Sequence, residues 1–157
     1  MFKSIKSTIK NVKFGKNVKI IEPVNLYNCT IGDNVFIGPF VEIQSNTLIG
    51  KNSRIQSHSF ICSNVTIGKN CFIGHGVMFT NDKFFNGKIE KNTSKFLNTK
   101  IGDNVLIGSN SSILPVKISK NITIGAGSVV TKNLTKKGIY AGNPAKKIIS
   151  KQSLNCI

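Results

Sequence analysis

An aliphatic residue recurs every six positions along most of this 157-residue chain. The longest unbroken run consists of isoleucines at Ile31, Ile37, Ile43, Ile49, Ile55, Ile61, Ile67 and Ile73. The spacing resumes at Ile101, Ile107 and Ile113, and again at Ile118, Ile124 and Val130. A period of six fits neither the turn of an α-helix nor the alternation of an ordinary strand. It is typical of a parallel β-helix built from hexapeptide repeats, so we expect an all-β solenoid.

The other positions of the repeat agree with this fold. Glycine often follows the aliphatic residue, asparagine or glycine stands three positions after it, and a small or branched residue stands four positions after it. Asn and Gly tolerate left-handed backbone angles, so they predict a sharp corner between short strands. Three hexads would close a coil of about 18 residues. The leading aliphatic residue and the small or branched residue four positions after it would both face inward. About seventeen hexads then predict five to six coils, paired through parallel strands.

The repeat changes near both ends. We read the N-terminal aliphatic positions as Val12, Val18 and Val24. A seven-residue step then reaches Ile31, which predicts one extra residue near Tyr27–Asn28. A five-residue step separates Ile113 from Ile118. The tail, residues 146–157, is expected to hold a short helix.

Residues 78–100 lack the hexad altogether and predict one long excursion loop. A long departure from a strict scaffold is more often functional than accidental. With this loop, the tail and the solenoid together, the length predicts a single domain over residues 1–157.

Composition narrows the class of protein. The net charge is +16, but the lysines are scattered and no basic run alternates with aromatic residues, so we do not expect nucleic acid as a partner. The N-terminus has no apolar run of the signal-peptide type and no stretch could span a membrane, so we expect a cytoplasmic protein without membrane insertion. Four cysteines without a C-x-x-C spacing predict reduced thiols, and we expect no metal.

Two C-terminal motifs carry a resemblance. The hexads, together with Gly125-Ala126-Gly127-Ser128-Val129-Val130-Thr131-Lys132 and Ala141-Gly142-Asn143-Pro144-Ala145-Lys146, resemble the left-handed β-helix acyltransferases over nearly the whole chain. The resemblance implies left-handed winding, a homotrimer and acetyl-CoA as co-substrate in a groove between two subunits.

A narrower match is similar to the N-acetyltransferases that act on nucleotide-linked 3-amino-3,6-dideoxyhexoses, carried as dTDP-sugars for surface glycans and O-antigens. It rests on Gln56-Ser57-His58-Ser59-Phe60-Ile61 and on Ile73-Gly74-His75-Gly76-Val77-Met78-Phe79-Thr80-Asn81-Asp82-Lys83-Phe84. In that family the Asn-Asp pair sits beside the sugar amine. The chain departs from it at Phe84-Phe85-Asn86, where relatives carry Tyr-Pro-Arg, and after Leu114-Pro115, where relatives carry Gly.

Acetyl transfer to an amine needs a positioned amine, an acceptor for its proton and a donor for the oxyanion. His75 is the candidate general base by residue type, and the 17-residue separation places His58 near it at one corner. The resemblance implies that Asn81 and Asp82 contact the amine and take part in catalysis. His58 and Phe84 complete the expected acceptor site. An exposed polar corner and an ordinary Asn-Asp turn remain open as structural readings of these residues.

The resemblance also implies a coenzyme path along the last coils. Its expected residues are Gly108, Ala126, Lys132, Asn143, Pro144, Lys146 and Lys147.

The same residues bear on three other functions that a solenoid of this kind could have. A zinc-dependent carbonic anhydrase of this architecture needs three histidines, and the chain has two. An acetyltransferase for a UDP-linked 3-amino sugar or for a hydroxyl acceptor, and a non-catalytic structural solenoid, remain as alternatives.

Overall fold

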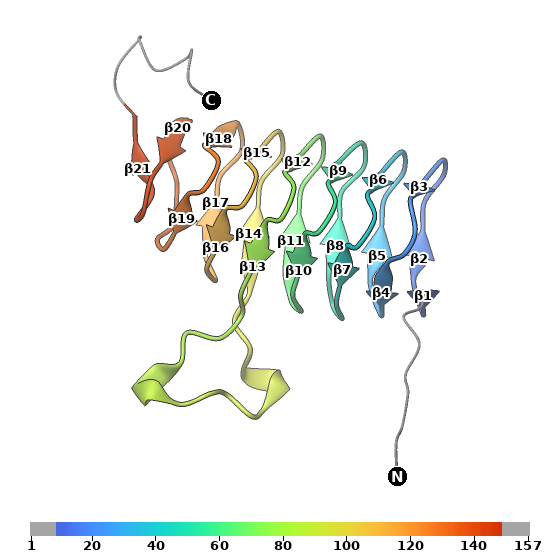
Figure 1. Ribbon diagram of the computed structural model, residues 1–157, viewed down its shortest axis with the longest axis horizontal. Coiled ribbons are helices and arrows are strands. Elements are labelled where there is room, and N and C mark those ends of the chain that lie inside the picture. Colours follow the sequence, from blue (N-terminus) through green and yellow to red (C-terminus); the bar gives the residue numbers. More distant parts are fainter. Residues whose placement is uncertain (1–8, 149–157) are drawn as a thin grey trace.

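The computed structural model describes residues 9–148, which form a three-sided solenoid of parallel strands (Figure 1). Sheet A contains β1 (Ile9–Lys10), β4 (Asn25–Tyr27), β7 (Glu42–Ile43), β10 (Phe60–Ile61), β13 (Met78–Phe79), β16 (Ser112–Ile113) and β19 (Val129–Val130). Sheet B contains β2 (Lys13–Phe14), β5 (Thr30–Ile31), β8 (Leu48–Ile49), β11 (Val65–Ile67), β14 (Thr99–Ile101) and β17 (Lys117–Ile118). Sheet C contains β3 (Lys19–Ile20), β6 (Phe36–Ile37), β9 (Arg54–Ile55), β12 (Phe72–Ile73), β15 (Leu106–Ile107), β18 (Ile122–Ile124), β20 (Gly138–Ala141) and β21 (Lys146–Lys147).

The all-β solenoid expected from the repeat is confirmed. Successive leading residues go to the three sheets in turn, so that Ile31 pairs with Ile49, Ile37 with Ile55, and Ile43 with Ile61. Each isoleucine of the long run has an exposed fraction of at most 1%, and the same holds for Ile101, Ile107 and Ile113. The ladder therefore forms one continuous core, because every coil covers the aliphatic residues of the next.

The second inward position is also confirmed. Its members Val35, Val41, Val65 and Val77 are buried. At Thr47, Ser53 and Ser59 the hydroxyl donates to a backbone carbonyl of the following coil, as Ser59 Oγ does to the Gly74 carbonyl at 2.8 Å. Thr99 is the exception among the described residues, because its buried hydroxyl has no hydrogen-bond partner. A small hydroxyl fits here because the carbonyl satisfies it inside an otherwise apolar prism.

The N-terminal reading was wrong by two residues. Strand pairing places Phe14, Ile20 and Leu26 on the aliphatic ladder, opposite Ile31, Ile37 and Ile43. Val12, Val18 and Val24 occupy the small inward position, as their neighbours' hydrogen bonds to the carbonyls of Cys29, Val35 and Val41 show. The step from Leu26 to Ile31 is therefore one residue short of a hexad, and no residue is inserted near Tyr27–Asn28.

The structure has about seven coils, more than the five to six expected, since sheet A alone carries seven strands. The undercount arose at the ends. The first coil begins at Ile9, ahead of the recognised repeat, and the last uses Leu134 and Tyr140, which pair with Ile118 and Ile124 outside the six-residue register.

The prism has three edges. We call the edge between sheets B and C the asparagine edge, because Asn17, Asn34, Asn52, Asn70, Asn104 and Asn121 follow one another along it with positive φ. Each donates a side-chain hydrogen bond to the next, at 3.0 to 3.2 Å. The left-handed corner predicted for asparagine is confirmed. We call the edge from sheet C to sheet A the histidine edge, because it carries His58 and His75.

Every change in coil length falls on the third edge, from sheet A to sheet B, which we call the loop edge. The short steps from Leu26 to Ile31 and from Ile113 to Ile118 lie there, and so does the excursion. The loop is shorter than the predicted range of residues 78–100, because Met78–Phe79 belongs to β13 and Thr99 begins β14. Residues 80–98 project from the prism and contain two short 3₁₀ turns, η1 (Phe85–Gly87) and η2 (Thr93–Lys95) (Figure 1).

The C-terminal prediction is corrected where the structure describes it. Instead of a helix, residues Lys146–Lys147 form β21, which runs antiparallel to β20. The rest of the expected helix, residues 149–157, lies outside the described residues. No helix within residues 9–148 is long and apolar enough to cross a membrane.

Candidate functional site

His75 stands exposed on the histidine edge, one coil after Ser57. Its Nδ1 lies 2.8 Å from the Ser57 hydroxyl, and its backbone N–H donates to Ser109 Oγ at 3.2 Å. The coil stacking that aligns Ser57, His75 and Ser109 holds the imidazole between two hydroxyl-bearing neighbours. When Nδ1 carries the proton and donates it to Ser57, Nε2 has a free lone pair facing outward.

His58 lies on the same edge in the preceding coil, at the left-handed corner position with φ of 62°. Its ring stacks on Phe40, with centroids 4.8 Å apart and planes 30° from each other. The two histidines are thus at one corner, as their spacing predicts, but they sit in different columns. From one coil to the next, His75 stacks on Ser57, whereas Gly76 stacks on His58.

Beyond His75 the residues of the histidine edge are mostly small, and the exception is Asn110, which is exposed and turns the corner after His75 with φ of 57°. Gly76 and Gly127 occupy the corner position, and Ser109 and Ala126 precede it in their coils. A Cβ on Gly108 would come within 2.4 Å of the Ala126 backbone nitrogen, while one on Gly127 would meet nothing within 4 Å. The backbones are therefore packed closely, and the outside of the edge is open at Gly127, whereas the Asn110 side chain lies over Gly76. We call Gly76, Ser109, Ala126 and Gly127 the small-residue strip.

Asp82 organises the loop. Its two carboxylate oxygens accept the backbone N–H groups of Phe84 and Glu90, each at 2.8 Å. The Asn81 carbonyl accepts the N–H of Leu97 at 2.9 Å and so joins the outgoing and returning limbs of the loop. Both sequence-predicted residues thus stand at the base of the loop, and no described hydrogen bond uses the Asn81 side chain.

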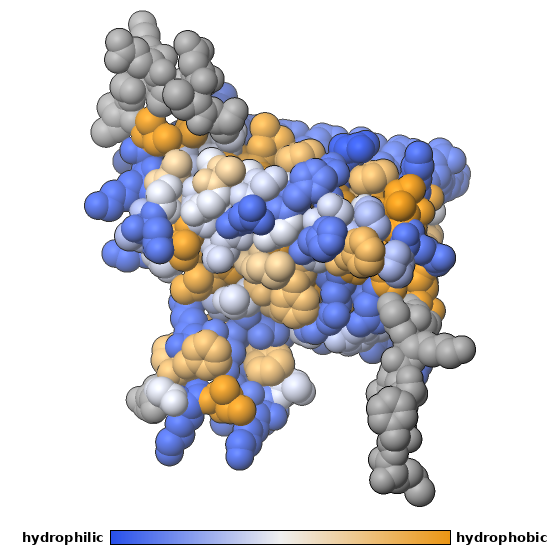
Figure 2. All heavy atoms as spheres, viewed as in Figure 1, coloured by the Kyte–Doolittle hydropathy of each residue, from blue (hydrophilic) through white to orange (hydrophobic). Residues whose placement is uncertain are grey.

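Phe84 is 60% exposed and adopts a left-handed backbone angle, with φ of 50°. Phe85 and Ile89 are also exposed, so the projecting loop carries apolar side chains on its surface, with hydrophilic side chains at its outermost points (Figure 2). We call Phe84, Phe85 and Ile89 the hydrophobic tip of the loop. Phe79, by contrast, is fully buried and belongs to the core.

A polar cleft that the sequence did not reveal lies between the loop and the prism. It encloses about 490 Å³ and includes Tyr27, Gln44, Ser63, Asn64 and Phe96 among its lining residues. Asn64 Nδ2 donates to the Phe96 carbonyl at 3.2 Å and ties the returning limb to the prism. The lining combines amides, hydroxyls and two aromatic rings, and it carries no charged side chain.

Tyr27 brings a hydroxyl into this cleft. Burial, and secondarily the charge of Glu42, raises the pKa of its phenol above the ordinary value, so the group stays a neutral hydrogen-bond donor. The cleft was missed because its members come from three coils and the loop, and only the 18-residue stacking with the returning limb brings them together.

The predicted coenzyme residues divide into two groups. Asn143 and Pro144 lie at the end of the small-residue strip. The residues on either side of them are held to Val129, just after Gly127, because Val129 N donates to the Gly142 carbonyl and Ala145 N donates to the Val129 carbonyl. Asn143 and Pro144 join Gly108 and Ala126 there, with Lys146 paired to Ala141 close by.

Lys132 and Lys147 are placed elsewhere. Lys132 follows β19 and so lies on the loop edge, across sheet A. The Lys147 side chain lies over Gly138, where an added Cβ would meet its Cε at 2.4 Å. Gly138 begins β20 at the side of sheet C away from the strip, so neither lysine gathers with the other candidates.

The three described cysteines are buried free thiols. Burial raises the pKa of Cys62 to about 12 and that of Cys29 to about 11. Within residues 9–148 no group of three His, Cys, Asp or Glu residues could hold a metal ion.

Comparison with protein families agrees with the geometry. One model, of the bacterial transferase hexapeptide with six repeats, matches residues 28–63. A second, of the hexapeptide repeat of succinyl-transferase, matches residues 64–78 and 98–132. Together they cover more than half of the chain. The chain belongs to the hexapeptide-repeat transferase family. The matched segments of this hexapeptide-repeat protein leave out the loop, which is the part that departs from the scaffold.

Solved structures show the same fold at low sequence identity. A mutant of perosamine N-acetyltransferase from Caulobacter crescentus, in complex with CoA and GDP-perosamine, has a TM-score of 0.67 at 18% identity over 92% of this chain. The chain spans 58% of the length of that neighbour. A maltose O-acetyltransferase from Clostridium difficile has a TM-score of 0.60 at 24% identity, covering 86% of this chain and 68% of the other.

The polySia-specific acetyltransferase NeuO is 28% identical, with a TM-score of 0.54, and the match covers 88% of this chain and 68% of that one. A comparison with curated proteins found no match.

Proposed function

We propose that this hexapeptide-repeat protein transfers an acetyl group from acetyl-CoA to the amine of a nucleotide-linked 3-amino-3,6-dideoxyhexose, carried as a dTDP-sugar. The observation that carries the proposal is the pairing of His75 with Ser57 at the start of the small-residue strip. It sets an exposed imidazole beside a strip of mostly small residues that can receive an extended coenzyme arm. The C. crescentus neighbour, with CoA and GDP-perosamine bound, supports the same pairing of substrates on this fold.

His75 acts as general base in this scheme. An amine attacks a thioester only in its neutral form, so its proton must leave before or during attack. The Ser57 hydroxyl fixes the ring so that Nε2 faces the acceptor, and the proton moves from the amine to Nε2. The C–S bond of the thioester then breaks and the coenzyme leaves as a thiolate. This thiolate takes the proton from the imidazolium, which restores the neutral imidazole.

Asn81 and Asp82 serve the acceptor in different ways. Asp82 holds the loop through the N–H groups of Phe84 and Glu90, which makes it a positioning residue. Asn81 stands on the loop edge, across sheet A from His75. In the homotrimer proposed below, its side chain therefore supplies an uncharged oxygen to an amine held at His75 of a second copy. The polar cleft with Tyr27 and Phe96 suits sugar hydroxyls and a flat ring, because amides and hydroxyls pair with the former and aromatics cover the latter.

The coenzyme arm follows the small-residue strip toward Asn143 and Pro144. Small residues allow close approach of an extended chain to the backbone, and Asn110 is the one larger side chain at a corner along the strip. Lys146 is placed to meet a phosphate at the end of this path.

We further propose a homotrimer in which the hydrophobic tip of the loop docks on a second copy. Phe84, Phe85 and Ile89 are each at least 60% exposed in the single chain. An apolar tip on a projecting segment is costly in water and gains by burial against a partner.

The test is a panel of nucleotide-linked amino sugars incubated with acetyl-CoA, with release of free thiol as the readout. We expect release with a dTDP-3-amino-3,6-dideoxyhexose, and no release with the corresponding 3-hydroxy sugar as matched control. Thiol release with the hydroxy sugar or with maltose, and none with any amino sugar, would replace the proposal by O-acetylation. No release with any acceptor would favour a non-catalytic solenoid.

A further inference from the structure

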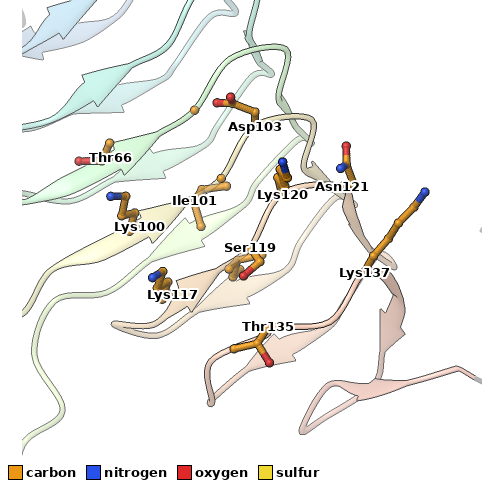
Figure 3. Close-up of a pocket in the computed structure, with 13 residues that line it drawn as sticks. Thr66, Lys100, Ile101, Asp103, Lys117, Ser119, Lys120, Asn121, Thr135 and Lys137 are labelled. Carbon is orange, nitrogen blue, oxygen red and sulfur yellow. The ribbon is translucent and has the colours of Figure 1, made fainter.

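A second hollow lies on the opposite side of the prism from the histidine edge. It runs over the last strands of sheet B and onto the asparagine edge (Figure 3), and it encloses about 670 Å³. This volume is within the range of roughly 300–1,000 Å³ found for small-molecule sites. We call it the lysine groove, after Lys100, Lys117, Lys120 and Lys137 in its lining.

The groove concentrates positive charge. Lys100 and Lys117 are direct register partners on the neighbouring strands β14 and β17, and both are exposed. Like charges placed opposite each other on one face of a sheet destabilise it. Lys120 and Lys137 stand on the side of the groove toward the asparagine edge (Figure 3).

The single acidic residue in the lining, Asp103, offsets only part of this charge. Asp103 Oδ1 accepts the backbone N–H of Lys69 at 2.8 Å and so serves the corner of the neighbouring coil. Hydroxyls of Thr66, Ser119 and Thr135 complete the lining as neutral donors. The groove thus offers donors and a net positive charge, with four lysines against one carboxylate.

The groove owes its shape to the shortened steps of the loop edge. The five-residue step from Ile113 to Ile118 brings β17 into line beside β14. After the Leu134 bridge, Thr135 to Lys137 cross the end of sheet B and supply its far wall. No residue assigned above to the acceptor or to the coenzyme lines this hollow.

We propose that the lysine groove is a binding site for a diphosphate group, such as that of a nucleoside diphosphate. Two pairs of lysines, one on sheet B and one toward the asparagine edge, match two linked phosphates better than one. Each Lys–phosphate contact is a charge-assisted hydrogen bond, and a bound dianion removes the repulsion between Lys100 and Lys117. The lining residues of this site differ from those assigned above to the acceptor and to the coenzyme, so its test does not require the proposed acetyl transfer to be correct.

Calorimetric titration of the full chain with inorganic pyrophosphate tests the proposal. We expect saturable binding that weakens as ionic strength rises to about 150 mM, because surface charge is screened over about 8 Å there. The double variant Lys100→Gln with Lys117→Gln should bind at least about tenfold more weakly. The matched control, Lys10→Gln with Lys19→Gln, removes the same charge from the first coil and should change the affinity less than about twofold.

Further ligands distinguish the source of the diphosphate. Tighter binding of UDP or dTDP than of pyrophosphate indicates a nucleotide, whereas tighter binding of coenzyme A indicates the coenzyme. The amide resonances of Gly68 and Gly102, which line the groove, should shift on binding, while that of Gly76 should not. Equal affinities of the two double variants, or binding only to vesicles of anionic lipid, would overturn the proposal. Unchanged thermal unfolding of both variants confirms that folding is not the cause.

Discussion

The asparagine edge and the histidine edge share one backbone and differ in the side chains they carry. Asn52 and Asn70 turn the first edge with φ of 60° and 55°, and Phe40 and His58 turn the second with φ of 60° and 62°. Asparagine is suited to this conformation, and its side chains also bond from coil to coil. A phenylalanine there is uncommon and strained, whereas histidine is among the residue types that adopt this conformation more often. The comparison teaches that the first edge is selected for stability, and that the second has given up some stability for exposed rings.

The largest expected effect separates the two edges by activity. Replacing His75 with Ala removes the proposed base and should lower kcat for amine acetylation by about 10²–10⁴-fold. Thermal unfolding should stay nearly unchanged because the side chain is exposed. Steady-state assay of thiol release measures the first effect, and scanning fluorimetry the second. Wild-type turnover in this variant would remove His75 from the mechanism, and Ser57→Ala should give a smaller loss of the same kind.

A change on the asparagine edge should do the reverse. Asn70 accepts from Asn52 and donates to Asn104, so Asn70→Ala breaks two hydrogen bonds and forces alanine into a left-handed angle. We expect a loss of about 1–3 kcal/mol in unfolding free energy, with turnover per folded molecule unaffected. Urea unfolding measures it. Asn70→Gly keeps the backbone conformation and should lose less, and an equal loss in both variants would show that the angle is not strained.

The loop edge gives a third, smaller effect. Phe84→Asn relieves a left-handed aromatic residue and should stabilise the single chain by up to about 1 kcal/mol. The same change removes an apolar contact from the hydrophobic tip and should weaken assembly. Urea unfolding of the dilute chain and sedimentation equilibrium report the two effects separately. Tighter assembly of the variant would rule out docking through this side chain.

The smallest effect concerns the buried thiols. Burial raises the pKa of Cys62 to about 12, whereas an unfolded thiol ionises near its ordinary value of 9.0. The folded state therefore holds its proton longer, and the stabilisation present below pH 9 is lost as pH rises toward 12. Iodoacetamide at about pH 8 should label the folded chain far more slowly than the urea-unfolded chain. Rapid labelling of Cys62 in the folded chain, located by peptide mass, would contradict its burial.

The six-residue period was sufficient to predict the three sheets, the inward isoleucines and the asparagine corners, since each rests on strictly local spacing. It failed at the N-terminus because both inward positions accept branched aliphatics. Val12, Val18 and Val24 keep a six-residue spacing of their own, so the pattern does not reveal that Phe14, Ile20 and Leu26 form the ladder. Only pairing with the next coil decides between the two readings.

The candidate site was predictable in part for the same reason. The spacing of His58 and His75 gave their common corner, but not the partners of the two rings, Phe40 and Ser57. The role of Asp82 in holding the loop was out of reach, because the loop has no period and its hydrogen bonds join residues that no rule of spacing relates. Lys132 and Lys147 were grouped with the coenzyme by motif alone, and the strand order separates them.

A stack of parallel strands can be lengthened by another copy as readily as by its own chain. At the C-terminal end, β21 runs antiparallel along the last strand of sheet C and presents a reversed pattern of hydrogen bonds. At the other end, each of the first three strands carries a lysine, namely Lys10, Lys13 and Lys19. Two such ends brought face to face would oppose like charges on every side of the triangle. The reversed strand disfavours the addition of a further parallel strand at one end, and these charges disfavour the contact of two copies through the other.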